Sequence, residues 1–266
     1  MTHTHQALDS RSQARGNPFL AWPRFLLIVG CSLVFAMFFP ALKLFVRKTD
    51  KRMALAAAFT RAWGRFCCRV AGYRMRVSGP LPPSGSLLAP NHQGYVDIIA
   101  VAACVPCLFV AKAETRGWPL FGTCIRVFEH VFVTRRKARA MRETVDAVEA
   151  RLRQSVSVCL FPEGTSSGGG KVLPFTSSFF EPALRSGAPI VPVTIIWGSL
   201  NPRVDRERDI AYWGSHRFLF HILRHLGLRK TTVHLIFSPP LTADSRSDRK
   251  TAAQSARAAV MANYTF

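Results

Sequence analysis

A run of 18 residues without a charge, Phe25–Leu42, is the strongest constraint on how this chain of 266 residues can fold. As a helix the run is roughly 27 Å long at about 1.5 Å per residue, enough to cross the hydrocarbon core of a bilayer. Pro40 can bend the helix, so it either spans the membrane or enters and returns. A signal peptide and a buried helix of a soluble protein are the alternatives. We expect residues 25–42 to be a transmembrane or re-entrant anchor.

The segments on either side extend this expectation. Residues 1–24 are polar and irregular, which predicts a flexible tail. Five basic residues within 43–52 follow the apolar run, against three before it, and positive charge stays on the cytoplasmic side. Residues 52–71 carry an apolar stripe at helical spacing opposite three arginines, which predicts a helix lying in the headgroup layer. A helix packed on the domain core is the alternative. Residues 25–72 are thus the predicted anchoring region, at the inner membrane with the rest of the chain cytoplasmic.

Charge and composition favour a membrane over nucleic acid as the partner. Lys and Arg number 36 against 15 Asp and Glu, and the net charge of +21 suits anionic membranes, nucleic acids or acidic substrates. An apolar fraction of 48% with 20 Phe is atypical of nucleic-acid-binding modules, so we expect no nucleic acid. The seven cysteines indicate a reducing compartment rather than a disulfide framework. Cys104 and Cys107 lack the second ligand pair of a zinc site, so no metal is expected.

From residue 73 onward, short apolar runs alternate with helical periods. Alternation of this kind predicts an α/β domain whose sheet is mixed and largely parallel, flanked by helices. The clearest helical period lies within residues 141–152, where apolar side chains recur every three or four positions. The predicted strands are Tyr73–Val77, Leu87–Ala89, Leu108–Ala111, Val131–Val133, Val156–Phe161, Ile190–Ile196 and Val233–Phe237.

The stretch Asn91–Asp97 places a histidine and a carboxylate five residues apart, directly after one of these strands. On a straight helix the two side chains would point roughly 140° apart. His92 and Asp97 therefore meet only if His92 lies in the turn before a helix and Asp97 in its first turn, where a carboxylate also suits the helix dipole. The carboxylate then fixes the tautomer of the imidazole, as a general base requires. A structural histidine beside a capping aspartate fits the same spacing.

A second polar turn follows the predicted strand Val156–Phe161. It reads Pro162-Glu163-Gly164-Thr165-Ser166-Ser167 and continues through three glycines to Lys171. A turn so rich in hydroxyls and free backbone N–H groups can hold an anionic headgroup. It is not the phosphate loop of nucleotide hydrolases, which needs a glycine at position 165 and a hydroxyl residue at 172. A flexible surface loop is the alternative.

Together the two stretches resemble the glycerolipid acyltransferase family, whose best-known members acylate lysophosphatidic acid (1-acylglycerol-3-phosphate). Asn91-His92 with Asp97 is similar to the first block of that family, and Phe161–Thr165 to the third. Phe132–Arg135 is similar to the second block, although Glu129 or His130 stands where a glycine is usual, and Pro189–Val193 resembles the fourth. The blocks follow the family's order between residues 73 and 240. The resemblance identifies residues 73–266 as an acyltransferase domain.

The resemblance also implies a mechanism and a set of site residues. A fatty acyl group would move from acyl-CoA or acyl carrier protein to the free hydroxyl of a lysolipid, with His92 as general base and Asp97 orienting it. Backbone N–H groups near Gly94 or Gly164 would hold the oxyanion, and Glu163 would support the turn or the acceptor. No cofactor or metal is implied. The candidate substrate-binding residues are Asn91, Lys112, Arg135, Glu163, Gly164, Thr165, Ser166 and Lys171.

Ser166 departs from the family pattern. Members that act on lysophosphatidic acid commonly carry an arginine directly after the Glu-Gly-Thr, and a serine cannot reproduce its bidentate grip on a phosphate. We expect 1-acylglycerol-3-phosphate as the acceptor, with Arg135, Lys112 or Lys171 compensating. The alternative acceptor is a lyso-ornithine lipid, whose headgroup is an amino acid.

Two rival functions remain beside direct transfer. A covalent acyl-cysteine intermediate needs a cysteine paired with a histidine, and the sequence pairs none. A non-catalytic membrane protein that binds anionic lipid would use the basic helix predicted at His216–Arg229 and leave the His/Asp pair structural. The positive charge also favours an acidic acyl carrier protein as a partner.

Overall fold

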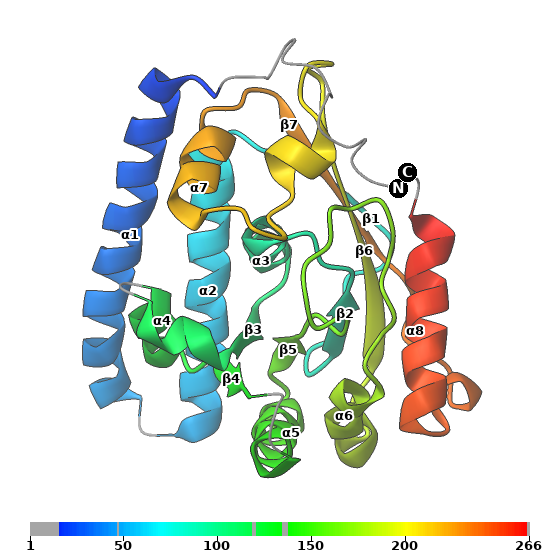
Figure 1. Cartoon of the computed structure of the whole chain (residues 1–266). Helices are drawn as coiled ribbons and strands as arrows, with labels where there is room; N and C mark the ends of the chain where they lie inside the picture. Colours follow the sequence, from blue (N-terminus) through cyan, green and yellow to red (C-terminus); the bar gives the residue numbers. More distant parts are fainter. Residues whose placement is uncertain (1–15, 47, 119–120, 135–137, 265–266) are drawn as a thin grey trace.

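Seven short strands form one mixed, largely parallel sheet, which confirms the fold class expected from the sequence. The computed structural model describes residues 16–46, 48–118, 121–134 and 138–264 (Figure 1). In these residues the strand order is β1-β7-β6-β2-β5-β3-β4, and only β6 and β7 are antiparallel neighbours. The strands are β1 (Arg74–Ser78), β2 (Leu87–Pro90), β3 (Cys107–Lys112), β4 (Val131–Val133), β5 (Ser157–Cys159), β6 (Ile190–Ser199) and β7 (Thr231–Phe237).

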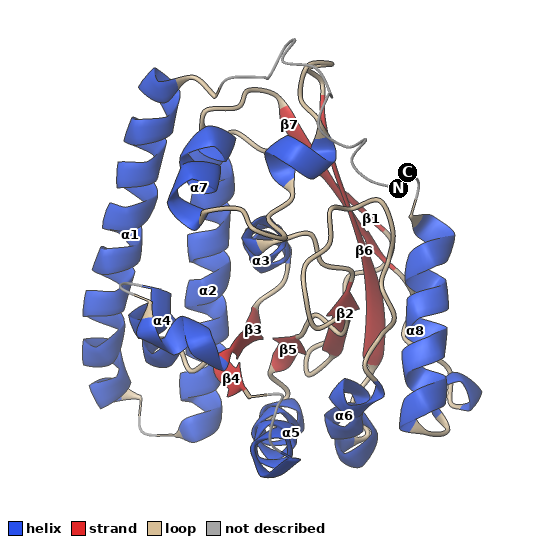
Figure 2. Ribbon diagram, in the orientation of Figure 1, coloured by secondary structure: helices blue, strands red, loops and turns tan. Residues whose placement is uncertain are grey.

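Helices cover both faces of the sheet (Figure 2). On one face Leu88, Cys159 and Val191 pack in a core with α3, and on the other Leu87 and Ile190 pack with α5, α6 and α8. Successive residues of a strand point to opposite faces of the sheet, so each strand contributes half of its side chains to each core. The helices are α1 (Pro18–Phe45), α2 (Thr49–Ala71), α3 (Tyr95–Cys104), α4 (Phe121–Val127), α5 (Ala138–Arg153), α6 (Glu181–Ser186), α7 (Phe218–Leu226) and α8 (Arg249–Asn263).

Short helical turns complete the fold at the ends of strands. Three are 3₁₀ turns, at Ala113–Gly117, Ser177–Phe180 and Asp244–Arg246, and one is a π turn at Arg206–Ile210. Because β2, β3, β4, β5 and β6 run in the same direction, their carboxyl ends meet at one edge of the sheet. The polar turns after β2 and β5 therefore lie side by side at that edge, where α/β folds carry their chemistry.

Helix α1 begins earlier than the sequence predicted. Asn17 caps it through a hydrogen bond from the Phe19 N–H to Oδ1 (2.9 Å), and Pro18 occupies the first turn, where its missing N–H costs nothing. Residues 18–24, predicted as part of a flexible tail, are thus helical, and only residues 1–15 of that tail lie outside the described residues. By length and composition α1 is long enough and apolar enough to cross a membrane.

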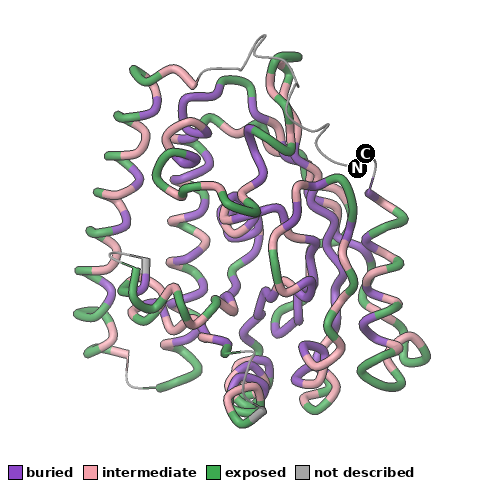
Figure 3. Tube along the Cα trace, in the orientation of Figure 1, coloured by how far each residue is buried: buried purple, intermediate pink, exposed green. Residues whose placement is uncertain are grey.

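Helix α1 lies along the body of the protein and is fastened to it at both ends. Near its start the Arg24 guanidinium donates to the carbonyls of Leu226 (2.8 Å) and Leu228 (2.9 Å), after α7. Near its end Lys43 Nζ lies 2.6 Å from Glu129 Oε1. Its other sides remain exposed and apolar (Figure 3), which favours contact with a membrane. The exposed side chains include Phe19, Trp22, Leu26, Leu27, Leu33, Met37 and Phe38.

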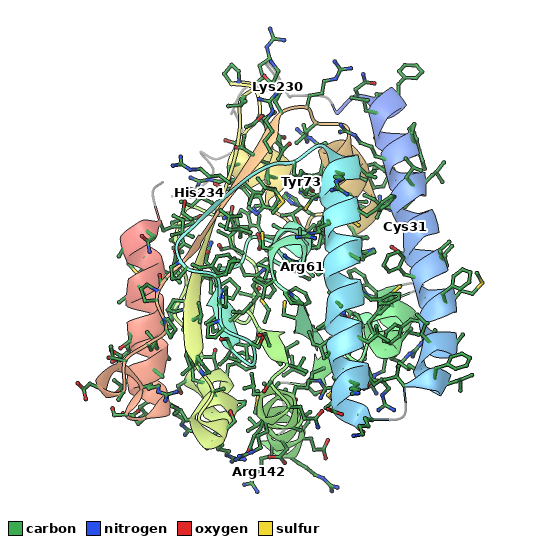
Figure 4. The ribbon with its side chains drawn as sticks, turned by 180° about the vertical axis from the view of Figure 1, so that it is seen from behind. Cys31, Arg61, Tyr73, Arg142, Lys230 and His234 are labelled. Atoms are coloured by element: carbon green, nitrogen blue, oxygen red, sulfur yellow. The ribbon has the colours of Figure 1, made fainter. Side chains whose placement is uncertain are left out.

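Helix α2 packs through a different face from the one the sequence suggested. The predicted apolar stripe is only half-buried, and its Ala62 is exposed. Apart from Met53, the buried residues of α2 are small and allow close packing: Ala56, Ala57, Thr60, Gly64, Cys67, Cys68 and Ala71. Arg65 and Arg69 are exposed on another side, and Figure 4 shows Arg61 projecting from the same helix. Helix α2 thus matches the alternative expectation of a helix packed on the domain core. Contact of its basic side with lipid headgroups stays a prediction.

Gly64 is the position where the approach of α2 to α3 leaves no room for a side chain. A Cβ there would lie 2.6 Å from the Ala103 backbone nitrogen and 2.8 Å from the Ala102 Cβ. We expect Gly64→Val to lower the melting temperature in detergent by several degrees, because overpacking costs about 1–3 kcal/mol. Gly30→Val is the matched control, since a Cβ at Gly30 in α1 meets nothing within 4 Å. Equal melting temperatures for the two variants would contradict this packing.

Candidate active site

His92 and Asp97 meet as the sequence predicted, across the turn from β2 into α3. His92 Nδ1 lies 2.9 Å from Asp97 Oδ2, and Asp97 is in the first turn of α3. A carboxylate accepts only, so Nδ1 carries the proton and Nε2 is left as the basic nitrogen. Among the described residues none hydrogen-bonds to that Nε2. The imidazole stacks on Phe161, with ring centroids 3.9 Å apart, and its side chain is 18% exposed.

The Asp97 carboxylate is fully buried and accepts four hydrogen bonds. Besides His92 Nδ1, its Oδ2 accepts from the backbone N–H groups of Gln93 (2.5 Å) and Gly94 (2.9 Å). Its Oδ1 accepts from Trp197 Nε1 of β6 at 2.7 Å. Four donors compensate a buried negative charge that would otherwise be costly. Asp97 is thereby held as an anion that cannot rotate away from the imidazole.

Gly94 allows the tight turn that makes this geometry. Its φ of +150° is open only to glycine, and a Cβ would lie 2.9 Å from the Tyr212 backbone nitrogen. Tyr212 in turn donates its N–H to the Gln93 carbonyl (2.8 Å). The turn is therefore enclosed by the segment between β6 and α7.

Asn91 supports the site. It is buried, and its side chain pairs with one residue of β6 in the manner of a strand backbone. Oδ1 accepts from the Ile195 N–H (2.7 Å) and Nδ2 donates to the Ile195 carbonyl (3.0 Å). Both polar ends of Asn91 are thus bonded to β6, which fixes the start of the turn that holds His92; the predicted contact of Asn91 with substrate stays a prediction.

Glu163 joins the two polar turns. Its Oε1 accepts from the His92 N–H (2.8 Å) and its Oε2 from the Leu173 N–H (3.1 Å). Burial raises the pKa of this carboxyl to about 7, against the effect of the two backbone donors, which favour the charged form. Two roles were expected for Glu163, support of the turn or of the acceptor, and these contacts correspond to support of the turn.

Ser166 is also engaged, through a contact that the sequence does not reveal. Its hydroxyl donates to the Tyr212 carbonyl (2.6 Å), and the next residue donates from Ser167 N to the His92 carbonyl (2.9 Å). Oxyanion donors were expected near Gly94 or Gly164, and the N–H groups of these two glycines themselves are occupied by Asp97 and by the Phe161 carbonyl. Among the described residues, the N–H groups of Thr165 and Ser166 in the same turn have no acceptor.

Neither of the two described basic candidates, Lys112 and Lys171, forms a hydrogen bond or ion pair with His92. Lys112 ends β3 at the same edge of the sheet, but it is exposed, and its Nζ lies 3.5 Å from Glu114 Oε1. Lys171 is exposed and lines a cavity of about 200 Å³ beside α8. Arg135 lies outside the described residues. The rest of that cavity is lined by Val172, Leu173, Pro174, Arg257, Met261 and Tyr264.

A residue shortly before the second sequence block has the left-handed backbone conformation that favours glycine. Glu129 has φ +62°, so it rather than His130 takes the place of the usual glycine. Ion pairs with Lys43 and Arg52 hold its side chain, and Arg151 donates to its carbonyl (2.7 Å). The exchange therefore ties the end of α1 to the domain.

Residues far away in the sequence complete the site. Trp197, Tyr212 and Tyr264 all contact the turn that holds His92, and none of them carries a local signal. The Tyr264 hydroxyl donates to the Gly169 carbonyl (2.7 Å) and lies 3.2 Å from Gln93 Nε2. Only the register of β6 against β2, and the docking of α8, bring these side chains to the site.

The thiols do not fit a covalent mechanism. Burial raises the pKa of Cys68 to about 12 and that of Cys104 to about 11, which disfavours the nucleophilic thiolate. All seven cysteines are free, and none is hydrogen-bonded to a histidine. The described residues contain no group of three His, Cys, Asp or Glu side chains that could hold a metal ion. That the reaction needs no metal stays a prediction.

Comparison with known proteins gives this geometry a family. The Acyltransferase family model matches residues 74–196. The lyso-ornithine lipid O-acyltransferase of Rhodobacter capsulatus is 32% identical over 209 residues, which cover 76% of this chain and 74% of that protein. This chain belongs to the acyltransferase family. The 1-acyl-sn-glycerol-3-phosphate acyltransferase of Neisseria meningitidis is 29% identical over 177 residues, covering 66% of this chain and 68% of the relative.

A solved structure supports the fold of this acyltransferase over nearly its whole length. The 1-acyl-sn-glycerophosphate acyltransferase of Thermotoga maritima has a TM-score of 0.61 with 23% sequence identity. The match covers 92% of this chain and 96% of the other, so it includes more than the region of the family model.

Trp197 holds the acyltransferase dyad from outside the sequence motif. We expect Trp197→Phe to lower kcat about tenfold with little change in KM, because Asp97 Oδ1 loses the one donor that the described residues give it and the imidazole is held less firmly. Steady-state kinetics measure both constants, and circular dichroism checks that the variant is folded. Trp22→Phe in α1 is the matched control. A folded Trp197→Phe enzyme with wild-type kcat would show that the contact does not orient the dyad.

Proposed function

We propose that this acyltransferase moves a fatty acyl group from a thioester to the free hydroxyl of a lysolipid, with His92 as general base. The observation that carries the proposal is the open Nε2 of an imidazole whose Nδ1 is bound to a buried carboxylate. Nε2 takes the hydroxyl proton as the oxygen attacks the thioester carbonyl. The tetrahedral intermediate then expels the thiolate, which takes the proton back from the imidazolium. General-base help of this kind contributes roughly 10²–10⁴-fold.

The turn after β5 offers donors for the oxyanion. The N–H groups of Thr165 and Ser166 lack acceptors among the described residues, and Ser167 ties the same turn to the His92 carbonyl. Backbone donors fixed in this way need no reorganisation when negative charge develops. Glu163 is a positioning residue, because it binds the backbone of His92 and not a reacting atom.

The donor is acyl-CoA or acyl carrier protein. Both are thioesters of anionic carriers, and the net charge of +21 attracts either of them. No cofactor takes part in the proposed step beyond this co-substrate.

The acceptor that the site favours is a lyso-ornithine lipid. Ser166 stands where lysophosphatidate enzymes commonly carry an arginine, and its hydroxyl is directed to the Tyr212 carbonyl instead of an anion. Lys112 and Lys171 were expected to compensate, but Lys112 is paired with Glu114, and among the described residues neither lysine side chain is hydrogen-bonded to the turn of Ser166. The lyso-ornithine lipid O-acyltransferases of Rhodobacter capsulatus and Rhizobium meliloti are both 32% identical to this chain.

Lysophosphatidic acid is the second candidate. The Neisseria meningitidis relative acts on 1-acylglycerol-3-phosphate by name, and Lys112 ends β3 at the same sheet edge as His92. A phosphate at that edge would compete with Glu114 for the ammonium group of Lys112.

We place the enzyme at the cytoplasmic face of the inner membrane, and the length and composition of α1 support attachment to a bilayer. The exposed apolar side of this helix faces away from the body, while Arg24 and Lys43 fasten its two ends to the domain. A helix held along the body in this way fits partial immersion in one leaflet better than a perpendicular span, which would draw charged parts of the domain into the hydrocarbon. Lysolipids would then reach His92 from the same leaflet.

The role of His92 predicts a large loss of turnover on its removal. His92→Ala should reduce kcat by roughly 10²–10⁴-fold while the protein stays folded, because Nε2 is the only base in the proposed step. Release of free thiol from acyl-CoA in the presence of lysolipid measures the rate. His234→Ala is the control, because His234 (labelled in Figure 4) lies on β7 and is bonded to Ser78 of the edge strand β1. A His92→Ala enzyme that keeps near-normal turnover would exclude the general-base mechanism.

The choice of acceptor predicts a ranking that one assay measures. With a single acyl-CoA, the purified enzyme should acylate lyso-ornithine lipid with at least tenfold higher kcat/KM than lysophosphatidic acid or other lysophospholipids. The reason is that Ser166 cannot form the ion pair with a phosphate that an arginine at this position would form. The reverse ranking would establish lysophosphatidic acid as the acceptor.

A further inference from the structure

The π turn Arg206–Ile210 lies against Gly168, the first of the three glycines in the turn after β5. It belongs to the connection from β6 to α7, drawn yellow in Figure 1. A Cβ on Gly168 would lie 2.7 Å from Glu207 Oε1 and 2.9 Å from its Cδ. The Glu207 carboxylate therefore rests on the backbone of the turn after β5, two residues beyond the position of the missing arginine.

The base and this carboxylate are joined by a short chain of contacts. Ser167, next to Gly168, donates its N–H to the His92 carbonyl (2.9 Å), and Ser166 donates to the Tyr212 carbonyl (2.6 Å). The Tyr212 N–H in turn donates to the carbonyl of Gln93, the residue after His92 (2.8 Å). Glu207 and His92 thus flank the same rigid pair of turns.

Glu207 is not used by the fold, whereas its acidic neighbours are. Asp205 caps the turn by accepting from the Arg208 N–H (2.8 Å), and buried Asp209 accepts from the side chains of Arg208 and Arg224. Among the described carboxylates only Asp50, Glu207 and Asp244 have neither an ion pair nor a hydrogen bond. In a protein with 36 basic and 15 acidic residues, an exposed and unpaired carboxylate beside the site leaves a negative point in a positive surface.

We propose that Glu207 is a specificity-determining residue that binds the ammonium group of the acceptor's headgroup and disfavours a phosphate there. The inference rests on the proposed acceptor, since an ornithine headgroup carries an ammonium group and a phosphomonoester does not. Exchange of an arginine at position 166 for a serine removes the attraction for an anion, and Glu207 supplies the opposite charge at the neighbouring Gly168. Like charges opposed in a binding site discriminate as effectively as attractive ones.

The test combines a change in the enzyme with a change in the substrate. Glu207→Gln should raise KM for lyso-ornithine lipid about fivefold with kcat unchanged, since a single exposed ion pair is a modest interaction. A lyso-ornithine lipid with its amine acetylated should show the same loss with the wild-type enzyme and no further loss with Glu207→Gln. Glu207→Arg should lower KM for lysophosphatidic acid while raising it for lyso-ornithine lipid.

Asp244→Asn is the matched control, because it removes an unpaired carboxylate from the opposite edge of the sheet, beyond the start of β6. It should leave every constant unchanged. Wild-type enzyme that ignores lyso-ornithine lipid would overturn the proposed acceptor. Wild-type enzyme that acylates it, with Glu207→Gln showing the same KM or an equal loss on both acceptors, would overturn the role of Glu207 alone.

Discussion

The buried Asp97 carboxylate is the interaction on which the rest of the site depends. A fully buried charge is tolerated only with a full set of donors, and here they come from three directions: His92, the backbone at Gln93 and Gly94, and Trp197. The first two require the turn from β2 into α3, and the third requires β6 beside β2. The sheet therefore serves the dyad by bringing an indole N–H to an oxygen that the local chain cannot reach. Loss of any one donor leaves a desolvated charge, so the arrangement is held together cooperatively.

The sequence contained the local half of this arrangement. Helical geometry alone required His92 before the helix and Asp97 in its first turn, and the structure has both there. All seven predicted strands exist, because apolar runs bounded by turn residues are local signals. Trp197, Tyr212 and Tyr264 were missed, since their contacts depend on strand register and helix docking over about a hundred residues or more. Asn91 and Ser166 were predicted to bind substrate, and the structure adds that each pairs with a distant backbone group, which a linear pattern does not reveal.

The anchoring region shows the same limit. Composition indicated an apolar helix and placed its start at Phe25, because the residues before it were taken as polar, whereas Asn17 and Pro18 form the N-terminal cap. For α2 the large side chains suggested the packing face, but small residues at Ala56, Thr60 and Gly64 let the helices approach. How closely two helices pack depends on how small the side chains between them are, and hydrophobic periodicity does not take side-chain size into account.

The serine at position 166 changes more than a single contact with the acceptor. An arginine there would have to extend toward an anion, but a serine is short enough to fasten the turn to the Tyr212 carbonyl. That bond draws the connection between β6 and α7 onto the site, and with it the π turn that places Glu207 on Gly168. One hydroxyl thus holds together the uncharged residue at position 166 and the segment that carries Glu207. An arginine placed at 166 would remove this fastening as well as add a charge, so under the proposed acceptor preference positions 166 and 207 act together.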